Sequence, residues 1–228
     1  TWLIRLGLIL YDWIGGVITL PKSKLINLEK DYDENPIKSD YTKGYEYSDL
    51  FVDDARLVLL NAQDAISKGA KIYTNANIQK VIRKRDNWEV FLNNGEVLYS
   101  KVIINASGPY ALDVLNNLIG IQSQKKIRHV QGSHIITEKL YKGEQAYILQ
   151  LDDKRIIFLI PYLDKYTLIG TTDHEVKSYD NPKITDIEKK YLISSVNKFI
   201  KNKITEDNII WTYSVSYTHL TLPTTTSV

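Results

Sequence analysis

Residues 102–109 read Val-Ile-Ile-Asn-Ala-Ser-Gly-Pro, an apolar run that ends in a turn of small residues. Residues 102–105 show no alternation of apolar and polar positions, which predicts a strand buried on both faces of a parallel sheet. Apolar positions from Tyr110 to Leu118 then follow helical spacing before Gly120. Such a strand–turn–helix order indicates an α/β protein. The turn would let a ligand approach the backbone closely, although Gly-Pro also serves turn geometry alone.

Upstream of this stretch, the pattern predicts a helix and then short strands. Asp53 stands at an N-cap position, apolar residues follow at helical spacing, and Gly69 comes just past the expected end at Lys68. Asn94-Gly95 predicts a hairpin turn with positive φ at both central residues. The expected strands are Lys71–Thr74 and a meander of Asn77–Lys84, Trp88–Leu92 and Glu96–Ser100.

Downstream, strands and turns alternate and predict a second, mostly antiparallel sheet. A helix over Ile184–Lys201 and a last strand over Asn208–Tyr213 complete the pattern. The fold class expected is therefore α/β in a mixed α+β arrangement. The strands expected in the second sheet are Val130–Thr137, Ala146–Gln150, Arg155–Pro161 and Thr167–Thr171.

The N-terminal part combines an apolar stretch with a segment of mixed composition. The apolar stretch Thr1–Leu20 contains Arg5 and Asp12, so it predicts a buried or interfacial helix instead of a membrane span of about 20 apolar residues. Residues 21–48 mix proline, glycine and charged residues without a sustained period, which indicates a long connection or an insertion.

Composition excludes several functional classes. The 228 residues are 43% hydrophobic and 25% charged, as expected of a globular chain, and the 29 basic and 27 acidic residues give a net charge of +2. The basic residues are scattered among acidic ones, so nucleic acid is not the expected partner. Cysteine is absent, which excludes disulfides, thiolate metal sites and thiol catalysis.

The two ends of the chain suggest an internal piece of a longer protein. Methionine is absent, so Thr1 is not an initiator residue. Residues 215–228 contain no Asp, Glu, Lys or Arg and are rich in threonine, unlike the rest of the chain. We expect this tail not to belong to the native fold.

A series of short motifs resembles the FAD-dependent glycerol-3-phosphate dehydrogenases of the aerobic, membrane-associated type, within the amino-acid-oxidase-like flavoproteins. They occur in the family's order over residues 1–214, and together they are far more specific than any one alone. The motifs are Gly44-Tyr-Glu-Tyr-Ser-Asp49, Val52-Asp-Asp-Ala-Arg-Leu-Val58, Asn105-Ala-Ser-Gly-Pro109, Gly132-Ser-His-Ile135, Gln145-Ala-Tyr-Ile-Leu-Gln150, Asp153-Lys-Arg-Ile156, Ile169-Gly-Thr-Thr-Asp173 and Trp211-Thr-Tyr-Ser214.

The resemblance implies a fold and an activity. It implies a partial FAD-binding domain with a β-meander, and an antiparallel substrate-binding sheet. The implied reaction oxidises sn-glycerol 3-phosphate to dihydroxyacetone phosphate, reduces FAD and passes electrons to quinone, in a cytoplasmic protein peripheral on the inner face of the cell membrane. The domains expected are 1–52 (helix and long connection), 53–120 (partial FAD-binding domain), 121–214 (substrate-binding sheet and helix) and 215–228 (non-native tail).

The sequence also departs from the family's pattern. The G-x-G-x-x-G turn that holds the FAD pyrophosphate on a helix N-terminus has no copy in this chain. The family follows Trp-Thr-Tyr-Ser with Gly-Val-Arg-Pro, whereas Ser214 precedes Val215-Ser216-Tyr217 here, so the substrate-phosphate arginine is missing. We expect the isolated 228 residues to bind FAD poorly and to be inactive.

Three residues are candidates for the substrate site. The residue pattern alone favours a strand histidine bonded to a carbonyl for His134. Its position in the family's motif implies instead the catalytic candidate, as a base for the C2 hydroxyl proton or as a hydrogen-bonding group for substrate. For Arg155, the match to the family's Asp-Lys-Arg implies a position near the substrate, whereas its residue pattern alone indicates a charge that covers a hairpin. Asp173 would orient a neighbouring side chain or cap a turn.

The cofactor candidates are Val81, Ala106, Ser107 and Gly108. The wider flavoprotein group commonly places a backbone contact to the adenine end of FAD near Val81, which is otherwise a core residue. The other three match the family's flavin-proximal turn. Residues 173–175 read Asp-His-Glu, but consecutive strand residues alternate faces, so no metal is expected.

Two other functions remain open from the sequence. A related FAD oxidase, acting on glycerol 3-phosphate with O₂ or on amino acids, would share the turn and the meander. A non-catalytic ligand-binding fragment would retain the scaffold without turnover.

Overall fold

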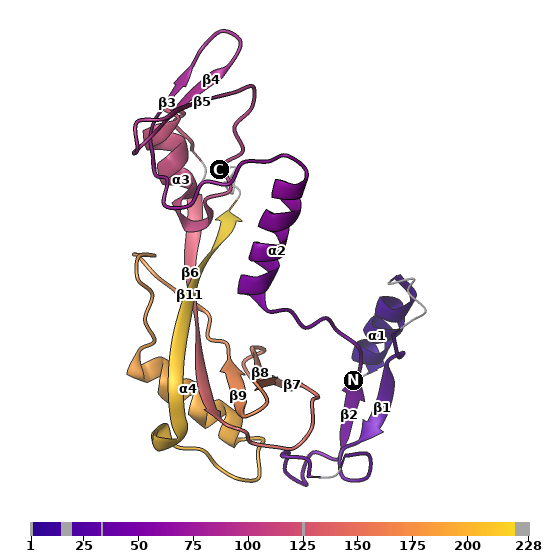
Figure 1. Cartoon of the computed structure of the whole chain (residues 1–228). Coiled ribbons are helices and arrows are strands. Elements are labelled where there is room, and N and C mark those ends of the chain that lie inside the picture. The colour runs from indigo at the N-terminus through magenta and orange to yellow at the C-terminus, as the bar shows by residue number, and fades with distance from the viewer. Residues whose placement is uncertain (1, 15–19, 33, 125, 222–228) are drawn as a thin grey trace, which may run out of the picture. The chain divides into compact units, whose positions relative to one another are not determined.

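The computed structural model describes residues 2–14, 20–32, 34–124 and 126–221 (Figure 1). They form two compact units, each described here by itself. Unit 1 comprises residues 1–51, 132–173 and 182–215, and unit 2 comprises residues 52–131, 174–181 and 216–228. The mixed α/β class expected from the sequence is confirmed, with antiparallel sheets throughout the described strands.

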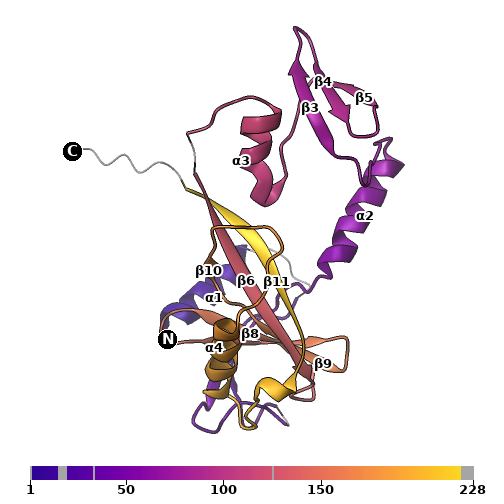
Figure 2. The ribbon, with the colours of Figure 1, turned by 90° about the vertical axis from the view of Figure 1, so that its left-hand side faces the viewer.

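The main sheet confirms the antiparallel strands predicted downstream of the turn. Its order is β10-β6-β9-β8-β7, and β11 pairs with β6; the two long strands lie side by side in both views (Figures 1 and 2). Residues 215–221 of the supposed tail continue β11, and residues 222–228 lie outside the described residues. That residues 215–228 are non-native stays a prediction. The bounds are β6 Lys126–Glu138, β7 Tyr147–Gln150, β8 Ile156–Tyr162, β9 Tyr166–Gly170, β10 His174–Glu175 and β11 Ile209–Thr221, the last longer than expected.

One face of this sheet packs against α4 (Asp186–Asn197), which is shorter than predicted. Ile135, Ile169 and Leu159 are cross-strand neighbours in β6, β9 and β8, and all three are fully buried in one core with Leu192 and Val196 of α4. Burying each such side chain contributes roughly 1.5–3 kcal/mol. Successive residues of a strand point to opposite faces of the sheet. The residues that directly precede or follow Ile135, Ile169 and Leu159 along their strands therefore lie on the face opposite α4.

The N-terminal segment differs from two expectations. The helix α1 (Trp2–Ile14) forms but has no buried side chain among the described residues, so the buried alternative was wrong. The supposed connection contains a short antiparallel pair, β1 (Lys24–Asn27) with β2 (Lys43–Glu46). These strands are four residues long and mix charged with apolar positions, which is too short for a period to be recognised. None of the described helices is long and apolar enough to cross a membrane.

Unit 2 begins with the predicted helix and meander. Asp53 caps α2 (Asp54–Ser67) by accepting a hydrogen bond from the Arg56 N–H at 3.0 Å, a contact of the kind that contributes about 1 kcal/mol. The meander runs β3 (Ile78–Arg83), β4 (Trp88–Leu92) and β5 (Val97–Ser100). In the hairpin between β4 and β5, Gly95 has positive φ but Asn94 does not, unlike the prediction. The turn spans residues 93–96 and not only the two residues predicted.

Two predicted strands of unit 2 are wrong. Residues 71–74 and 102–105 form no strand, and in the latter Val102 is 68% and Ile104 86% exposed. A parallel strand exists only where neighbouring strands supply hydrogen bonds, and no described strand pairs with either segment. The helical stretch after the turn is confirmed as three continuous pieces: a 3₁₀ turn (Gly108–Tyr110), α3 (Ala111–Asp113) and a π-helical turn (Val114–Leu118).

Candidate functional site

His134 lies in β6 on the sheet face opposite α4. Its cross-strand partner is Gly170 of β9, whose next partner across the sheet is Phe158 of β8. A Cβ atom on Gly170 would lie 2.1 Å from Cδ2 of the His134 ring, so only glycine admits the imidazole at this place. The sheet therefore provides a backbone surface on which the ring rests.

Tyr213 of β11 covers the ring as well. The His134 and Tyr213 ring centroids are 4.7 Å apart and the planes differ by 5°, a stacked pair. Tyr213 is 38% exposed, so its phenol lies at the surface of unit 1. Sequence reasoning missed this residue, because a tyrosine in a strand usually serves the core; its place two residues after Trp211 in the quoted motif was the available signal.

Burial tunes the chemistry of His134. Nδ1 of the ring is buried and has no hydrogen-bond partner among the described residues. Loss of hydration disfavours the imidazolium form, so burial lowers the pKa of His134 below its ordinary value of 6.5. The imidazole is therefore neutral at neutral pH and able to accept a proton. The alternative of a histidine bonded to a carbonyl through Nδ1 does not describe this ring.

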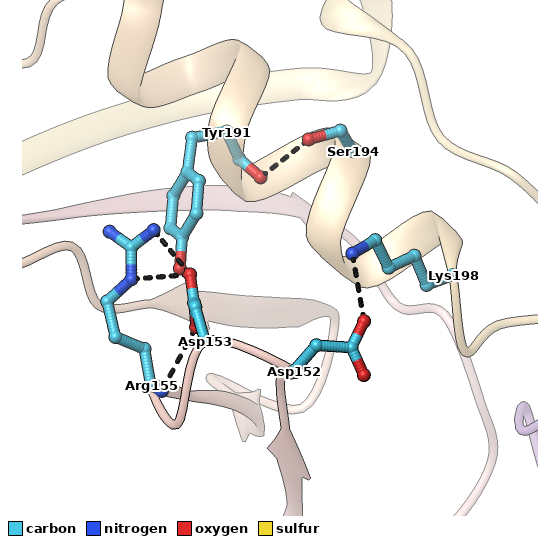
Figure 3. A network of polar contacts seen from close by, with 6 residues as sticks. All are labelled: Asp152, Asp153, Arg155, Tyr191, Ser194 and Lys198. Carbon is cyan, nitrogen blue, oxygen red and sulfur yellow. Dashed lines mark hydrogen bonds and ion pairs between the residues drawn. The ribbon is translucent and has the colours of Figure 1, made fainter.

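Arg155 occupies a different environment (Figure 3). Its guanidinium donates to Asp153 at 2.6 and 2.8 Å and lies 4.1 Å from the ring centroid of Tyr191 on α4. The hydrogen bond with Asp153 is the main cause of its raised pKa. In the same view Lys198 pairs with Asp152 at 3.6 Å. These contacts join the β7–β8 hairpin to α4.

The structure does not bring Arg155 and His134 onto one face. Arg155 contacts α4, whereas His134 lies on the opposite side of the sheet. Asp173 is exposed at the end of the segment after β9, and its charge contributes a minor part of the raised pKa of Arg155. A substrate contact by Arg155 or Asp173 stays a prediction.

The predicted flavin turn in unit 2 is organised by Asn105. Its Oδ1 accepts hydrogen bonds from Ser107 N at 3.3 Å and Ser107 Oγ at 2.6 Å, and its Nδ2 donates to Ala111 O at 2.8 Å. Gly108 has φ +55°, a conformation that favours glycine, and a Cβ atom on it would meet nothing within 4 Å. The turn is therefore internally held and open at Gly108, which suits close approach of a ligand.

Tyr110 ties this turn to residues 174–181 of the same unit. Its hydroxyl donates to Asp180 at 2.8 Å, and its ring meets Tyr179 edge-on at 4.9 Å. Tyr179 in turn lies 4.4 Å from the His129 ring. No sequence pattern indicated this aromatic group, because its members are far apart along the chain.

Val81 lies in β3, paired in register with Val90 of β4. The order β3-β4-β5 leaves β3 at an edge of its sheet, so alternate peptide groups of β3 point away from β4 and are available to a ligand. Among the described ranges, no three His, Asp or Glu side chains gather in a way that could hold a metal ion. The edge of β3 and the open turn both fit a bound cofactor.

Comparison with known proteins gives a consistent result. The family model described as FAD dependent oxidoreductase matches residues 15–224. The chain is 40% identical over 222 residues to D-erythritol 1-phosphate dehydrogenase of Brucella abortus (strain 2308), covering 93% of this chain and 44% of that protein. It is 41% identical over 219 residues to glycerol-3-phosphate dehydrogenase of Pseudomonas tolaasii, covering 93% and 42%.

A solved structure shares the fold. The glycerol-3-phosphate dehydrogenase from Bacillus halodurans complexed with FAD matches with a TM-score of 0.73 and 24% identity, over 85% of this chain and 40% of that one. The chain thus spans less than half the length of these relatives.

Proposed function

Because this chain belongs to the family of FAD-dependent oxidoreductases, we propose that its protein oxidises sn-glycerol 3-phosphate to dihydroxyacetone phosphate. The observation that supports this most strongly is the identity of about 40% to two dehydrogenases named for polyol phosphates, over 93% of the chain. The activity is proposed for the protein expressed from its complete gene.

In this proposal His134 is the base. Its neutral imidazole would accept the proton of the C2 hydroxyl. FAD, when bound, would supply the hydride acceptor for C2. The stacked Tyr213 and the backbone at Gly170 restrict the ring to one orientation. A base held in one orientation lowers the entropic cost of reaching the transition state.

The residues proposed to hold FAD are Val81, Ala106, Ser107 and Gly108. The free edge of β3 supports a backbone contact at Val81. The opening at Gly108 supports close approach of the cofactor to the turn that Asn105 holds. Asp173 is carried in the proposal as a substrate contact. For Arg155, which contacts Tyr191 on the α4 side, we propose the other alternative, a charged residue that covers the hairpin, and its substitution tests the choice.

Electron transfer to quinone, and a peripheral position on the inner face of the cell membrane, belong to the proposal through the family resemblance. Quinone-dependent turnover in the membrane fraction tests both together. Dehydrogenase activity that remains in the supernatant after centrifugation, at a rate that added quinone does not change, would contradict them.

The experiment for the central proposal is dye-linked turnover by the purified protein. We expect reduction of the dye with glycerol 3-phosphate and none with glycerol. Equal rates with the two compounds, or none with either, would contradict a polyol-phosphate dehydrogenase, and the latter would favour a non-catalytic binding protein.

A second substrate is favoured by a specific observation. The relative from Brucella abortus is named for D-erythritol 1-phosphate and is as similar as the glycerol-3-phosphate dehydrogenase. Comparing kcat/KM for the two phosphates decides between them. Measuring peroxide in air during the same assay separates either dehydrogenase from an oxidase that uses O₂.

A further inference from the structure

Glu188 is a buried carboxylate in the first turn of α4. The residue is 7% exposed. Its Oε1 accepts hydrogen bonds from Ser133 Oγ at 2.7 Å and Thr172 Oγ1 at 2.8 Å, and its Oε2 accepts from Thr185 N and Oγ1 at 2.8 and 2.9 Å. A capping box needs only the contacts to Thr185. The two bonds to Ser133 and Thr172 lead out of the helix into the sheet.

The network continues to a third segment. Ser133 Oγ lies 2.9 Å from Ser214 Oγ of β11, and because the Ser133 hydroxyl hydrogen goes to Glu188, Ser214 is the donor. The Ser133 N–H donates to Thr172 Oγ1 at 2.9 Å. One carboxylate therefore connects β6, the segment after β9, and β11 to the start of α4.

Each strand residue of this network is next to a residue of the His134 site. Ser133 precedes His134 in β6, and Ser214 follows Tyr213 in β11. Since neighbouring strand residues point to opposite faces, Ser133 and Ser214 meet on the α4 side while His134 and Tyr213 stack on the other. A shift of β6 or β11 along its own axis would therefore break the buried hydrogen bonds and the ring stack at the same time.

The carboxylate form of Glu188 is needed for these contacts. Burial opposes its charge, but the hydrogen bonds from Thr185, Ser133 and Thr172 outweigh that cost and hold the pKa of Glu188 below its usual value. A glutamine has one oxygen and one NH₂ group, so it cannot accept hydrogen bonds on both sides as the carboxylate does, and either the Thr185 N–H or the hydroxyls of Ser133 and Thr172 lose their acceptor. Replacing the charge therefore disrupts the network without changing the size of the side chain.

Resting on the proposed function, we infer that Glu188 is a positioning residue for the reaction, which holds β6 and β11 in the register that stacks His134 on Tyr213. It acts from the opposite side of the sheet and touches no reacting atom. Thr172, which both donates to Glu188 and accepts from Ser133, is the second member of this device.

The test compares matched variants of the protein expressed from its complete gene. Glu188→Gln removes the charge, and Asp186→Asn is its control, because Asp186 lies in the same first turn with its side chain 81% exposed. Thr172→Val removes the hydroxyl at nearly constant shape, whereas Thr172→Ser retains it and should rescue. Thermal melting identifies any variant that does not fold. If Glu188→Gln does not fold, the comparison of Thr172→Val with Thr172→Ser still tests the inference.

The principal readout needs no turnover. Diethyl pyrocarbonate modifies histidine rings, and peptide mass spectrometry gives the rate at His134 relative to the exposed His174. We expect Glu188→Gln and Thr172→Val to raise the relative rate at His134 severalfold, and Asp186→Asn and Thr172→Ser to match wild type. The same two disruptive variants should lose kcat by about tenfold or more with little change in KM, because a displacement of about 1 Å can cost about 100-fold.

An unchanged modification rate at His134 in folded Glu188→Gln and Thr172→Val would overturn the inference, whatever happens to turnover. Equal behaviour of Thr172→Ser and Thr172→Val would overturn it too, since the hydroxyl would then be irrelevant. If wild type oxidises no polyol phosphate, the proposed function fails while the modification experiment still decides whether Glu188 holds the stack.

Discussion

The imidazole of His134 and the phenol ring of Tyr213 lie parallel, with centroids 4.7 Å apart and planes within 5° of each other. On the neighbouring strand, the His134 ring lies against Gly170. A Cβ atom at Gly170 would come to 2.1 Å from Cδ2 of His134. Both contacts hold the imidazole in one orientation, as a base in the proposed reaction requires.

Gly170→Ala should displace the His134 ring. The added methyl group cannot share the space of Cδ2, so we expect a loss of stability of about 1–3 kcal/mol from overpacking. We also expect a loss of kcat of about 100-fold from displacement of the base. Denaturant unfolding and steady-state kinetics measure the two effects. In the control Gly44→Ala, the new Cβ atom would come no nearer than 3.4 Å to Ile26; equal effects in both variants would contradict the account.

The pH profile should reflect a histidine that must be neutral. Since burial lowers the pKa of His134 below 6.5, kcat/KM should be constant at neutral pH and fall only as the pH drops below 6.5 through that lowered value. Tyr213→Ala exposes the ring, which raises this pKa toward 6.5 and moves the acid limb to higher pH. Trp211→Ala, at an exposed residue of the same strand, should leave the limb in place. A limb that does not move in Tyr213→Ala would speak against this assignment.

Arg155→Ala tests the predicted substrate contact. The guanidinium is already bonded to Asp153 and stacked on Tyr191, on the face away from His134. We therefore expect KM for glycerol 3-phosphate to change by no more than about twofold, a smaller effect than the roughly tenfold expected from losing one charge-assisted hydrogen bond to a phosphate. A rise of tenfold size, absent from Tyr191→Phe, would restore Arg155 as a substrate residue.

Asn105→Ala should weaken cofactor binding. Without the side chain, Ser107 loses its acceptor and the carbonyl of Ala111 loses its donor, so the turn at Gly108 loosens. We expect FAD affinity, measured by fluorescence titration of the apoprotein, to fall by about tenfold for roughly 1.4 kcal/mol of lost organisation. Asn61→Ala, in which only a bond to Leu57 within α2 is lost, serves as the control. Identical FAD affinities in the two variants would remove Asn105 from the account.

Local signals predicted local structure well. The cap at Asp53, the meander and the strands of the main sheet follow from turn residues and alternation within the segment itself. The strand expected at 102–105 was wrong, because a buried parallel strand depends on partners that an apolar run cannot reveal. The pair β1–β2 was not predicted. Each strand is held by hydrogen bonds to the other, and neither four-residue segment has a composition that indicates a strand by itself.

The site was predictable only in part. The family resemblance predicts His134 as a site residue, but the sequence does not show the stack on Tyr213 or the contact with Gly170. Glu188 was missed, because an acid in the first turn of a helix usually faces solvent; the spacing from Thr185 indicated a capping box but not the bonds to Ser133 and Thr172. The site is formed by contacts between strands that are far apart in the sequence, which local patterns do not predict.

The most direct test of the account is anaerobic reduction of the bound flavin, followed by stopped-flow absorbance in wild type and His134→Ala. The account predicts that glycerol 3-phosphate bleaches the flavin band in wild type, and that His134→Ala slows the bleaching by about 100-fold or more while the flavin stays bound. Bleaching at the wild-type rate in the variant, or a purified protein whose flavin no polyol phosphate reduces, would contradict it.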